Sequence, residues 1–129
     1  MGVVYRASLR TTRMNAVETD IDSGAGAATL EIGTTGFASV LATFTLSDPA
    51  GSVSGDVLTF SGMPKSTTAS NTGTAAEARI KESGGTVIIS GLTVGTSGTN
   101  VIISPSTSIT SGQTVNLTAA TLTHNTSGV

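Results

Sequence analysis

Residues 76–90, with the sequence AEARIKESGGTVIIS, decide the fold class of this chain. From residue 76 to residue 81 apolar side chains alternate with charged ones, which is the two-residue period of a strand with one buried face. Gly84 and Gly85 can adopt positive φ at little cost, as the tight turn of a hairpin requires. The β-branched run of residues 86–90 then brings the chain back. This stretch therefore predicts an antiparallel β-hairpin.

Strand-like segments of the same kind lie on both sides of the hairpin. The clearest covers residues 38–46, ASVLATFTL, in which every second side chain is apolar. Further strands are expected at residues 30–32, 57–60, 92–94, 100–104 and 114–122, and the small polar residues 65–73 are expected to form an exposed loop. Short β-branched strands joined by Gly, Ser and Asn turns are typical of an antiparallel β-sandwich or a jelly roll. We therefore expect an all-β fold.

One helix is expected, from Arg6 to about Ile21, because apolar residues recur there at helical spacing and the segment lacks Gly and Pro. The expected organisation is an N-terminal arm and helix over residues 1–26, followed by a single β-sandwich domain over residues 27–129. Three acidic residues lie near the end of this helix, where the helix macrodipole disfavours negative charge.

Three arginines are the candidate interface residues. Arg6, Arg10 and Arg13 are spaced i, i+4 and i+7, so they share one face of the helix. In one interpretation their aliphatic stems lie along the sandwich and their guanidinium groups reach carboxylates such as Glu31 or Asp56. In the other, the stripe docks on an acidic surface of a partner. The sequence leaves both interpretations open.

The charged residues are few and unevenly distributed. Only 11% of the residues are charged, against roughly a quarter in an average soluble protein, while 41 of 129 are Ser or Thr. All 14 Lys, Arg, Asp and Glu residues precede Ser83, and His124 is the one titratable side chain after it. The C-terminal part of the chain, residues 83–129, is either a plain hydroxyl-rich sheet or a surface that faces another protein. Because there is no Trp and there are only three Phe, the core is thin and oligomerisation is expected to stabilise it.

The sequence offers no constellation for catalysis. There is no Cys, and His124 has no carboxylate near it in sequence, so a general base with an orienting acid is not expected. We therefore predict a protein that is not an enzyme, with no cofactor and no metal site. A net charge of −2 without a basic block predicts no nucleic-acid partner, and the lack of a long apolar run predicts no membrane span.

Both ends of the chain resemble a known group of proteins. Residues Tyr5–Thr19, YRASLRTTRMNAVET, resemble a start common in small virion structural proteins of tailed bacteriophages, and residues Ser108–Thr118, SITSGQTVNLT, resemble their closing strands. The resemblance implies a non-enzymatic β-sandwich protein of the phage particle. Among such roles it favours a capsid decoration, or cement, protein, which is expected to be a homotrimer on the outer head surface. Its partner would then be the major capsid protein or another virion protein.

Two alternatives remain at this point. A tail-, collar- or fibre-associated virion protein would have a similar composition. A glycan-binding module belongs to a different class, and it would require an exposed aromatic side chain, such as Tyr5 or Phe37, beside a polar cleft.

Overall fold

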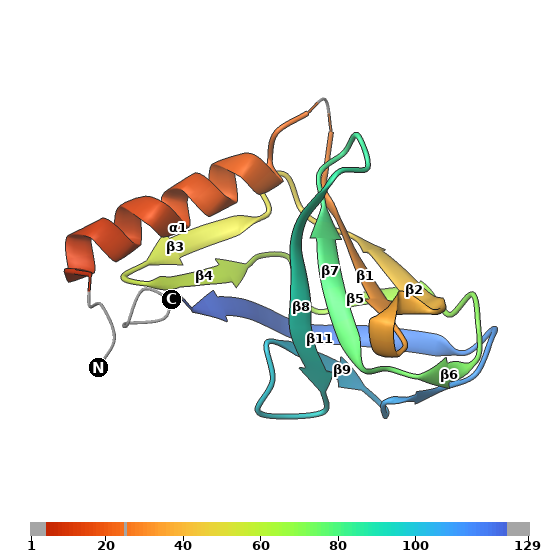
Figure 1. Ribbon diagram of the computed structural model, residues 1–129. Helices are drawn as coiled ribbons and strands as arrows, with labels where there is room; N and C mark the ends of the chain where they lie inside the picture. The colour runs from red at the N-terminus through yellow and green to blue at the C-terminus, as the bar shows by residue number, and fades with distance from the viewer. Residues whose placement is uncertain (1–4, 25, 124–129) are drawn as a thin grey trace.

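The computed structural model describes residues 5–24 and 26–123 and contains one N-terminal helix followed by strands (Figure 1). His124 lies outside the described residues. The elements in chain order are α1 (Ala7–Ile21), β1 (Thr29–Gly33), the 3₁₀ turn η1 (Thr35–Phe37), β2 (Val40–Thr45), β3 (Gly51–Ser54), β4 (Val57–Phe60), β5 (Lys65–Thr68), β6 (Gly73–Thr74), β7 (Glu77–Lys81), β8 (Val87–Gly95), β9 (Val101–Ser104), β10 (Ser108–Ile109) and β11 (Thr114–Thr123). The described part of the chain is therefore rich in β-structure with one α-helix, as its sequence predicts.

The strands differ from the expected sandwich in how they pair. Nine of them belong to one sheet in the order β2-β1-β7-β8-β9-β11-β4-β3, with β5 paired to the first half of β11. β6 and β10 form a separate antiparallel pair. β8 and β9 run parallel, with Val94 beside Val101 and Gly95 beside Ile102, whereas the other neighbours are antiparallel. The sheet is thus mixed rather than purely antiparallel.

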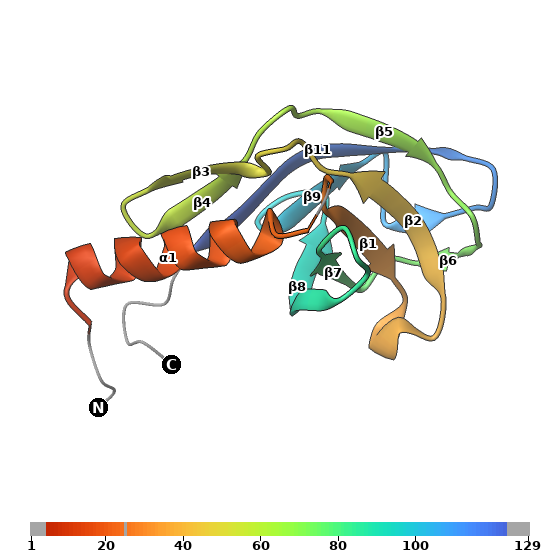
Figure 2. The same ribbon diagram turned by 90° about the horizontal axis from the view of Figure 1, so that it is seen from above.

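The sheet curls so that β5, the strand that branches from β11, comes close to β2 at one end of the sheet (Figures 1 and 2). This curl brings β5 beside β2, although no ladder joins these two strands. We call the line along which β5 lies beside β2 the seam. At one end of the seam the Ser70 amide donates to the Leu41 carbonyl at 2.8 Å, and the Asn71 side-chain amide donates to the Val40 carbonyl at 2.7 Å. At the other end Lys65 Nζ donates to Ser47 Oγ at 3.3 Å. Side chains on the concave face are therefore enclosed.

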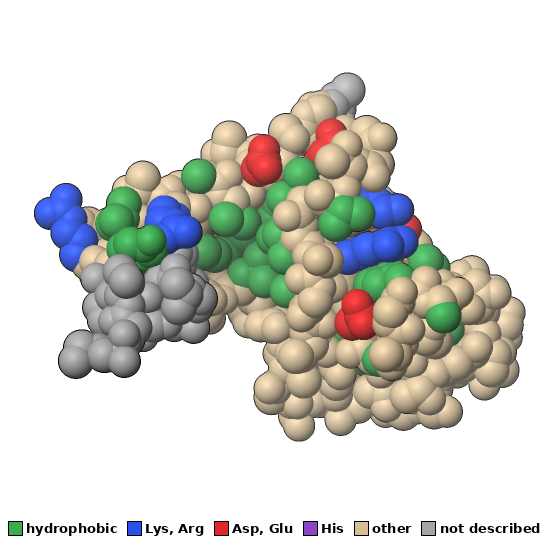
Figure 3. All heavy atoms as spheres, in the orientation of Figure 1, with side chains coloured by type: hydrophobic (Ala, Val, Ile, Leu, Met, Phe, Trp, Pro, Cys, Tyr) green, Lys and Arg blue, Asp and Glu red, His purple; other side chains and the backbone are tan. Residues whose placement is uncertain are grey.

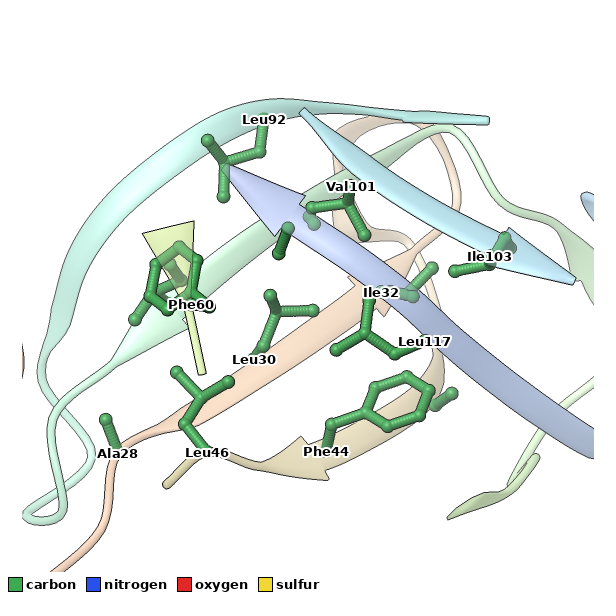
Figure 4. Packing of buried hydrophobic residues seen from close by; sticks show 14 of the residues in the cluster. Ala28, Leu30, Ile32, Phe44, Leu46, Phe60, Leu92, Val101, Ile103 and Leu117 are labelled. Atoms are coloured by element: carbon green, nitrogen blue, oxygen red, sulfur yellow. The ribbon is translucent and has the colours of Figure 1, made fainter. Parts of the chain in front are cut away.

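The core fills the inside of this curl, where the apolar side chains of β1, β2, β9 and β11 point toward one another (Figure 4). Every fully buried side chain in the described part of the chain is hydrophobic. The largest are Phe44, Ile21, Leu30, Ile32, Leu41, Leu58, Ile80, Ile103, Ile109, Leu117, Val101 and Val115. Most of these are aliphatic, as expected from a composition with few aromatic residues.

Two expectations from the sequence are corrected. Residues 65–68 are not part of an exposed loop but form β5, whose polar strand KSTT pairs with residues Thr114–Leu117 of β11. Residues 92–94 are not a separate strand but the end of β8. Gly91, with φ of 75°, lies at an irregularity where Ala78 pairs with Leu92 and Ile80 with Ile89, so β8 bulges and continues.

α1 is seated on the hairpin of β3 and β4, at one end of the sheet (Figure 2). Met14 and Ile21 are buried in the same cluster as the sheet's core, and Val17 packs against it partly exposed. These side chains recur at intervals of three and four residues, so they form one stripe along the helix. This stripe fixes which face of α1 turns toward the sheet.

Candidate interaction surfaces

The stripe of three arginines is divided by the way α1 sits on β3 and β4. Arg10 faces the sheet, and its Nε lies 3.3 Å from Oδ2 of Asp56 in the β3–β4 turn. Its guanidinium group also donates to the backbone carbonyl of Tyr5. The neighbouring Thr11 hydroxyl donates to the carbonyl of Gly55 at 2.6 Å. Arg10 therefore attaches the helix to the hairpin, as the intramolecular interpretation with Asp56 predicts.

Arg6 and Arg13 point to solvent. Arg13 lies over the ring of Tyr5, with 4.6 Å from its guanidinium carbon to the ring centroid. Arg6 precedes the first turn of α1 with an extended backbone, and its side chain forms no cap. In the described part of the chain no carboxylate forms an ion pair with Arg6 or Arg13. Docking on a partner therefore stays a prediction, and Arg6 and Arg13 are the members of the stripe that are accessible for it.

Glu31 has partners other than the arginine stripe. Its Oε1 lies 2.7 Å from Arg79 Nε and 3.3 Å from Lys81 Nζ, because β1 and β7 place Glu31 directly beside Arg79. Burial on its own would raise the pKa of Glu31, but the hydrogen bonds from Arg79 and Lys81 and the charges of these residues lower it below its ordinary value. Arg79 also lies over Phe37, 4.1 Å from the ring centroid. These residues form an ion-paired cluster on the outer face of the sheet.

The C-terminal end of α1 carries a pair of carboxyl groups. The pKa of Glu18 is raised from 4.5 to about 7. The largest cause is its hydrogen bond to Asp22, followed by burial and by the negative charge of Asp22. Oδ1 of Asp22 accepts the backbone amide of Ala50 at 2.9 Å, which fixes this carboxyl group against the sheet. Glu18, in the acidic end of the helix that the sequence predicts, therefore keeps its proton to a higher pH than an ordinary Glu.

Stability is expected to fall as the pH rises through the range in which Glu18 loses this proton. Because the pKa of Glu18 is higher in the folded state, the folded chain binds more protons between pH 4.5 and about 7. The melting temperature should therefore be a few degrees higher at the acidic end of this range than above it. Glu18→Gln, which keeps a donor for Asp22, should flatten this dependence.

Thermal unfolding of the wild-type chain, Glu18→Gln and Asp20→Asn across this pH range measures the effect. Asp20 is an exposed carboxylate on the same turn, so its amide variant should keep the wild-type slope. An unchanged slope in Glu18→Gln would show that the carboxyl pair does not control the pH dependence.

An open groove of about 420 Å³ lies at the seam between β2 and β5. Its lining residues are Thr43, Phe44, Thr45, Gly62, Pro64, Lys65, Ser66 and Thr67. Phe44 is buried beneath it, so the accessible lining consists mostly of hydroxyl groups with Lys65 at one end. The two aromatic candidates for sugar stacking, Tyr5 and Phe37, do not line this groove, and each has an arginine over one ring face.

The uncharged C-terminal half is contiguous in space, because β8, β9 and β11 are neighbours in the sheet. Val87 is 43% exposed, and the adjacent Ile88 and Ile89 are partly buried. Figure 3 shows hydrophobic side chains gathered between α1 and β8 and few charged side chains below them. This part of the surface is therefore both neutral and partly apolar.

Comparison with known proteins gives no relative: no family model, no curated protein and no solved structure matches the chain. Within residues 5–24 and 26–123, no three His, Cys, Asp or Glu side chains are grouped so that they could hold a metal ion. No helix in this part of the chain is long and apolar enough to cross a membrane.

Proposed function

We propose that this chain is a non-enzymatic structural protein of a tailed-bacteriophage particle, and specifically a capsid decoration protein. In this role it would bind the outer surface of the head as a homo-oligomer, such as a trimer, and stabilise the shell. The sequence resemblance at residues 5–19 and 108–118 supports the proposal, and these segments include most of α1, all of β10 and the first half of β11. We also propose that the fold of this chain is related to the β-sandwich and jelly-roll folds of virion proteins.

The observation that carries the proposal is the neutral surface of β8, β9 and β11. A decoration protein acts by burying contact area between neighbouring subunits of the shell. Burying hydroxyl groups and aliphatic side chains costs less desolvation free energy than burying charges. The exposed Val87 and the lack of charge after residue 82 therefore suit a surface that another protein covers.

A tail-, collar- or fibre-associated role shares this surface chemistry and is the nearest alternative. The two roles differ in copy number, since a decoration protein covers the whole shell and a tail or collar component is present in few copies. A glycan-binding role is less well supported, because the hydroxyl-lined groove between β2 and β5 contains no exposed aromatic side chain.

Binding to mature phage heads that lack the protein tests the proposal. We expect the sedimented heads to retain many copies of the protein, clustered in threes on the head surface. Arg6→Ala/Arg13→Ala should weaken this attachment about tenfold if the outward arginines contact an acidic shell surface. Arg10 is kept in this variant, because its contact with Asp56 holds α1 in place.

The matched control is Asn15→Ala/Thr19→Ala. It changes exposed, uncharged residues on the side of α1 away from Arg6 and Arg13, and it should bind like the wild-type chain. Absence of wild-type binding, or a handful of copies per head, would refute the decoration role and favour the tail or collar. Full attachment of the arginine variant would remove the arginines from the interface.

A further inference from the structure

At the seam the edge of β2 that does not pair with β1 faces β5 (Figure 2). In an antiparallel pair, the residues that bond the partner strand recur at every second position. The Leu46 amide donates to the Ala28 carbonyl at 2.8 Å and so continues the ladder of β1 with β2. The even-numbered residues of β2 therefore bond β1, and the backbone groups of Thr43 and Thr45 point toward the seam.

The facing edge of β5 follows the same rule. The Ala69 amide donates to the Gln113 carbonyl at 2.8 Å and continues the ladder of β5 with β11. The odd-numbered residues of β5 therefore bond β11. The backbone groups of Ser66 and Thr68 are left pointing toward β2.

The two edges begin to pair and then stop. The bond from the Ser70 amide to the Leu41 carbonyl fits the alternation of both strands, but no ladder continues from it along β2 and β5. The open groove of about 420 Å³ lies there instead. The groove is therefore bordered on both sides by strand edges that are not joined in a ladder.

A positive charge lies at one end of these edges. Lys65 is half-buried in the groove lining, and its Nζ donates to the Ser47 hydroxyl oxygen at 3.3 Å. In the described part of the chain no carboxylate forms an ion pair with Lys65, whereas Lys81 and Arg79 on the outer face share Glu31. A ligand with a carboxylate would supply the missing negative charge.

We propose that the seam is a binding site for an extended peptide segment of another protein, which inserts between β2 and β5 as an additional strand. Its backbone would pair with the free edge of β2 on one side and with that of β5 on the other, as in other interactions by strand addition. An acidic side chain at one end of the segment would pair with Lys65. The site involves neither the outward arginines nor β8, so it goes beyond the proposed function and does not depend on it.

The seam must widen to admit a strand. Neighbouring strands lie about 4.8 Å apart, so β2 and β5 would have to stand about 10 Å apart. Some of their Cα atoms now lie within 8 Å of each other. Hydrogen bonds at the two ends hold the seam, from Ser70 and Asn71 at one end and from Lys65 at the other. Two ladders would replace these bonds, and the inserted strand would keep Phe44 covered.

The two faces of the seam determine the side chains that the segment needs. Phe44 is buried on the concave face, and Lys65 lies on that face too, because it pairs with the buried Leu117. The exposed hydroxyl groups of Thr43 and Thr45 lie on the outer face. A matching segment therefore alternates apolar residues, which face the core, with small polar residues outside. Its acidic residue faces inward at the Lys65 end.

Peptide binding to the full chain, followed by amide chemical shifts in NMR spectra, tests the site. The probes are two six-residue peptides with blocked ends, Glu-Thr-Val-Thr-Val-Thr and the same residues in reverse order. We expect at least one of them to bind with a Kd below about 1 mM. It should shift the seam amides most, namely those of Thr43, Thr45, Ser66 and Thr68. Changing the peptide Glu to Gln, or Lys65→Gln in the chain, should each weaken binding about tenfold, and both together no further.

Lys81→Gln is the matched control, because Lys81 contacts Glu31 on the outer face, and its affinity for the peptide should be that of the wild-type chain. A peptide with every second backbone amide methylated cannot form one of the two ladders and should bind at least about tenfold more weakly. Circular dichroism checks that both variants fold.

Absence of shifts at the seam with both peptides at about 5 mM overturns the proposal. So does wild-type affinity of the Gln peptide, of the methylated peptide or of folded Lys65→Gln. Shifts produced by glucuronate but by neither peptide would show a site for acidic sugars and would also overturn it. These results need no phage heads, so their outcome is separate from that of the head-binding experiment.

Discussion

Leu117→Ala is expected to lower the free energy of unfolding by about 2–5 kcal/mol, through lost apolar burial and the cavity that remains. Leu117 is fully buried in β11, the strand that joins the two parts of the sheet. It pairs with Lys65 of β5 on one side and with Ile103 of β9 on the other. Since small domains are stable by only about 5–15 kcal/mol in total, this single change should leave the fold marginal.

Urea unfolding followed by circular dichroism measures this loss. Thr114→Ala is the control, because Thr114 is exposed on the same strand and its replacement should change the stability little. If Leu117→Ala does not fold, Leu117→Val should still fold with a smaller loss. A change of less than about 1 kcal/mol in Leu117→Ala would contradict the packing of β11 at the centre of the core.

The parts of the fold that could be predicted from sequence are those in which one segment carries its own pattern. Alternating apolar residues identified the first strand of the β7–β8 hairpin and the strands β1 and β2, and helical spacing identified α1. β5 carries no such signal, because its residues are polar and they form a strand only by pairing with β11. The parallel contact of β8 with β9 also depends on a distant path of the chain, and hairpin reasoning does not predict it.

The candidate interface was predicted to a similar extent. Helical spacing places Arg6, Arg10 and Arg13 on one face of α1, but it does not say how that helix rotates against the sheet. Burial of Met14 and Ile21 sets the rotation, and it turns Arg10 inward to Asp56 while Arg6 and Arg13 remain outside. Similarly, alternation places Arg79 and Lys81 on one face of β7, but only the register of β1 shows that Glu31 lies beside Arg79 and within reach of Lys81.

Gly51→Ala is expected to separate β3 from β4 and so to loosen the seat of α1. Gly51 is the first residue of β3 and pairs with Phe60. A Cβ atom at this position would lie 2.2 Å from the carbonyl oxygen of Thr59 and 2.9 Å from the Cα of Phe60, both closer than real contacts allow. These are backbone atoms, so no side-chain rotation can relieve the clash. The strand must move, at a cost of about 1–3 kcal/mol.

Hydrogen exchange resolved by segment distinguishes this local effect from general destabilisation. Because α1 packs on β3 and β4, its amides should exchange faster in Gly51→Ala, while those of β1 and β7 keep most of their protection. Gly26→Ala is the matched control, since the nearest atom to its added Cβ would be 4.0 Å away. Unchanged protection of α1 in Gly51→Ala would mean that the apolar contacts of Met14 and Ile21 hold the helix without β3.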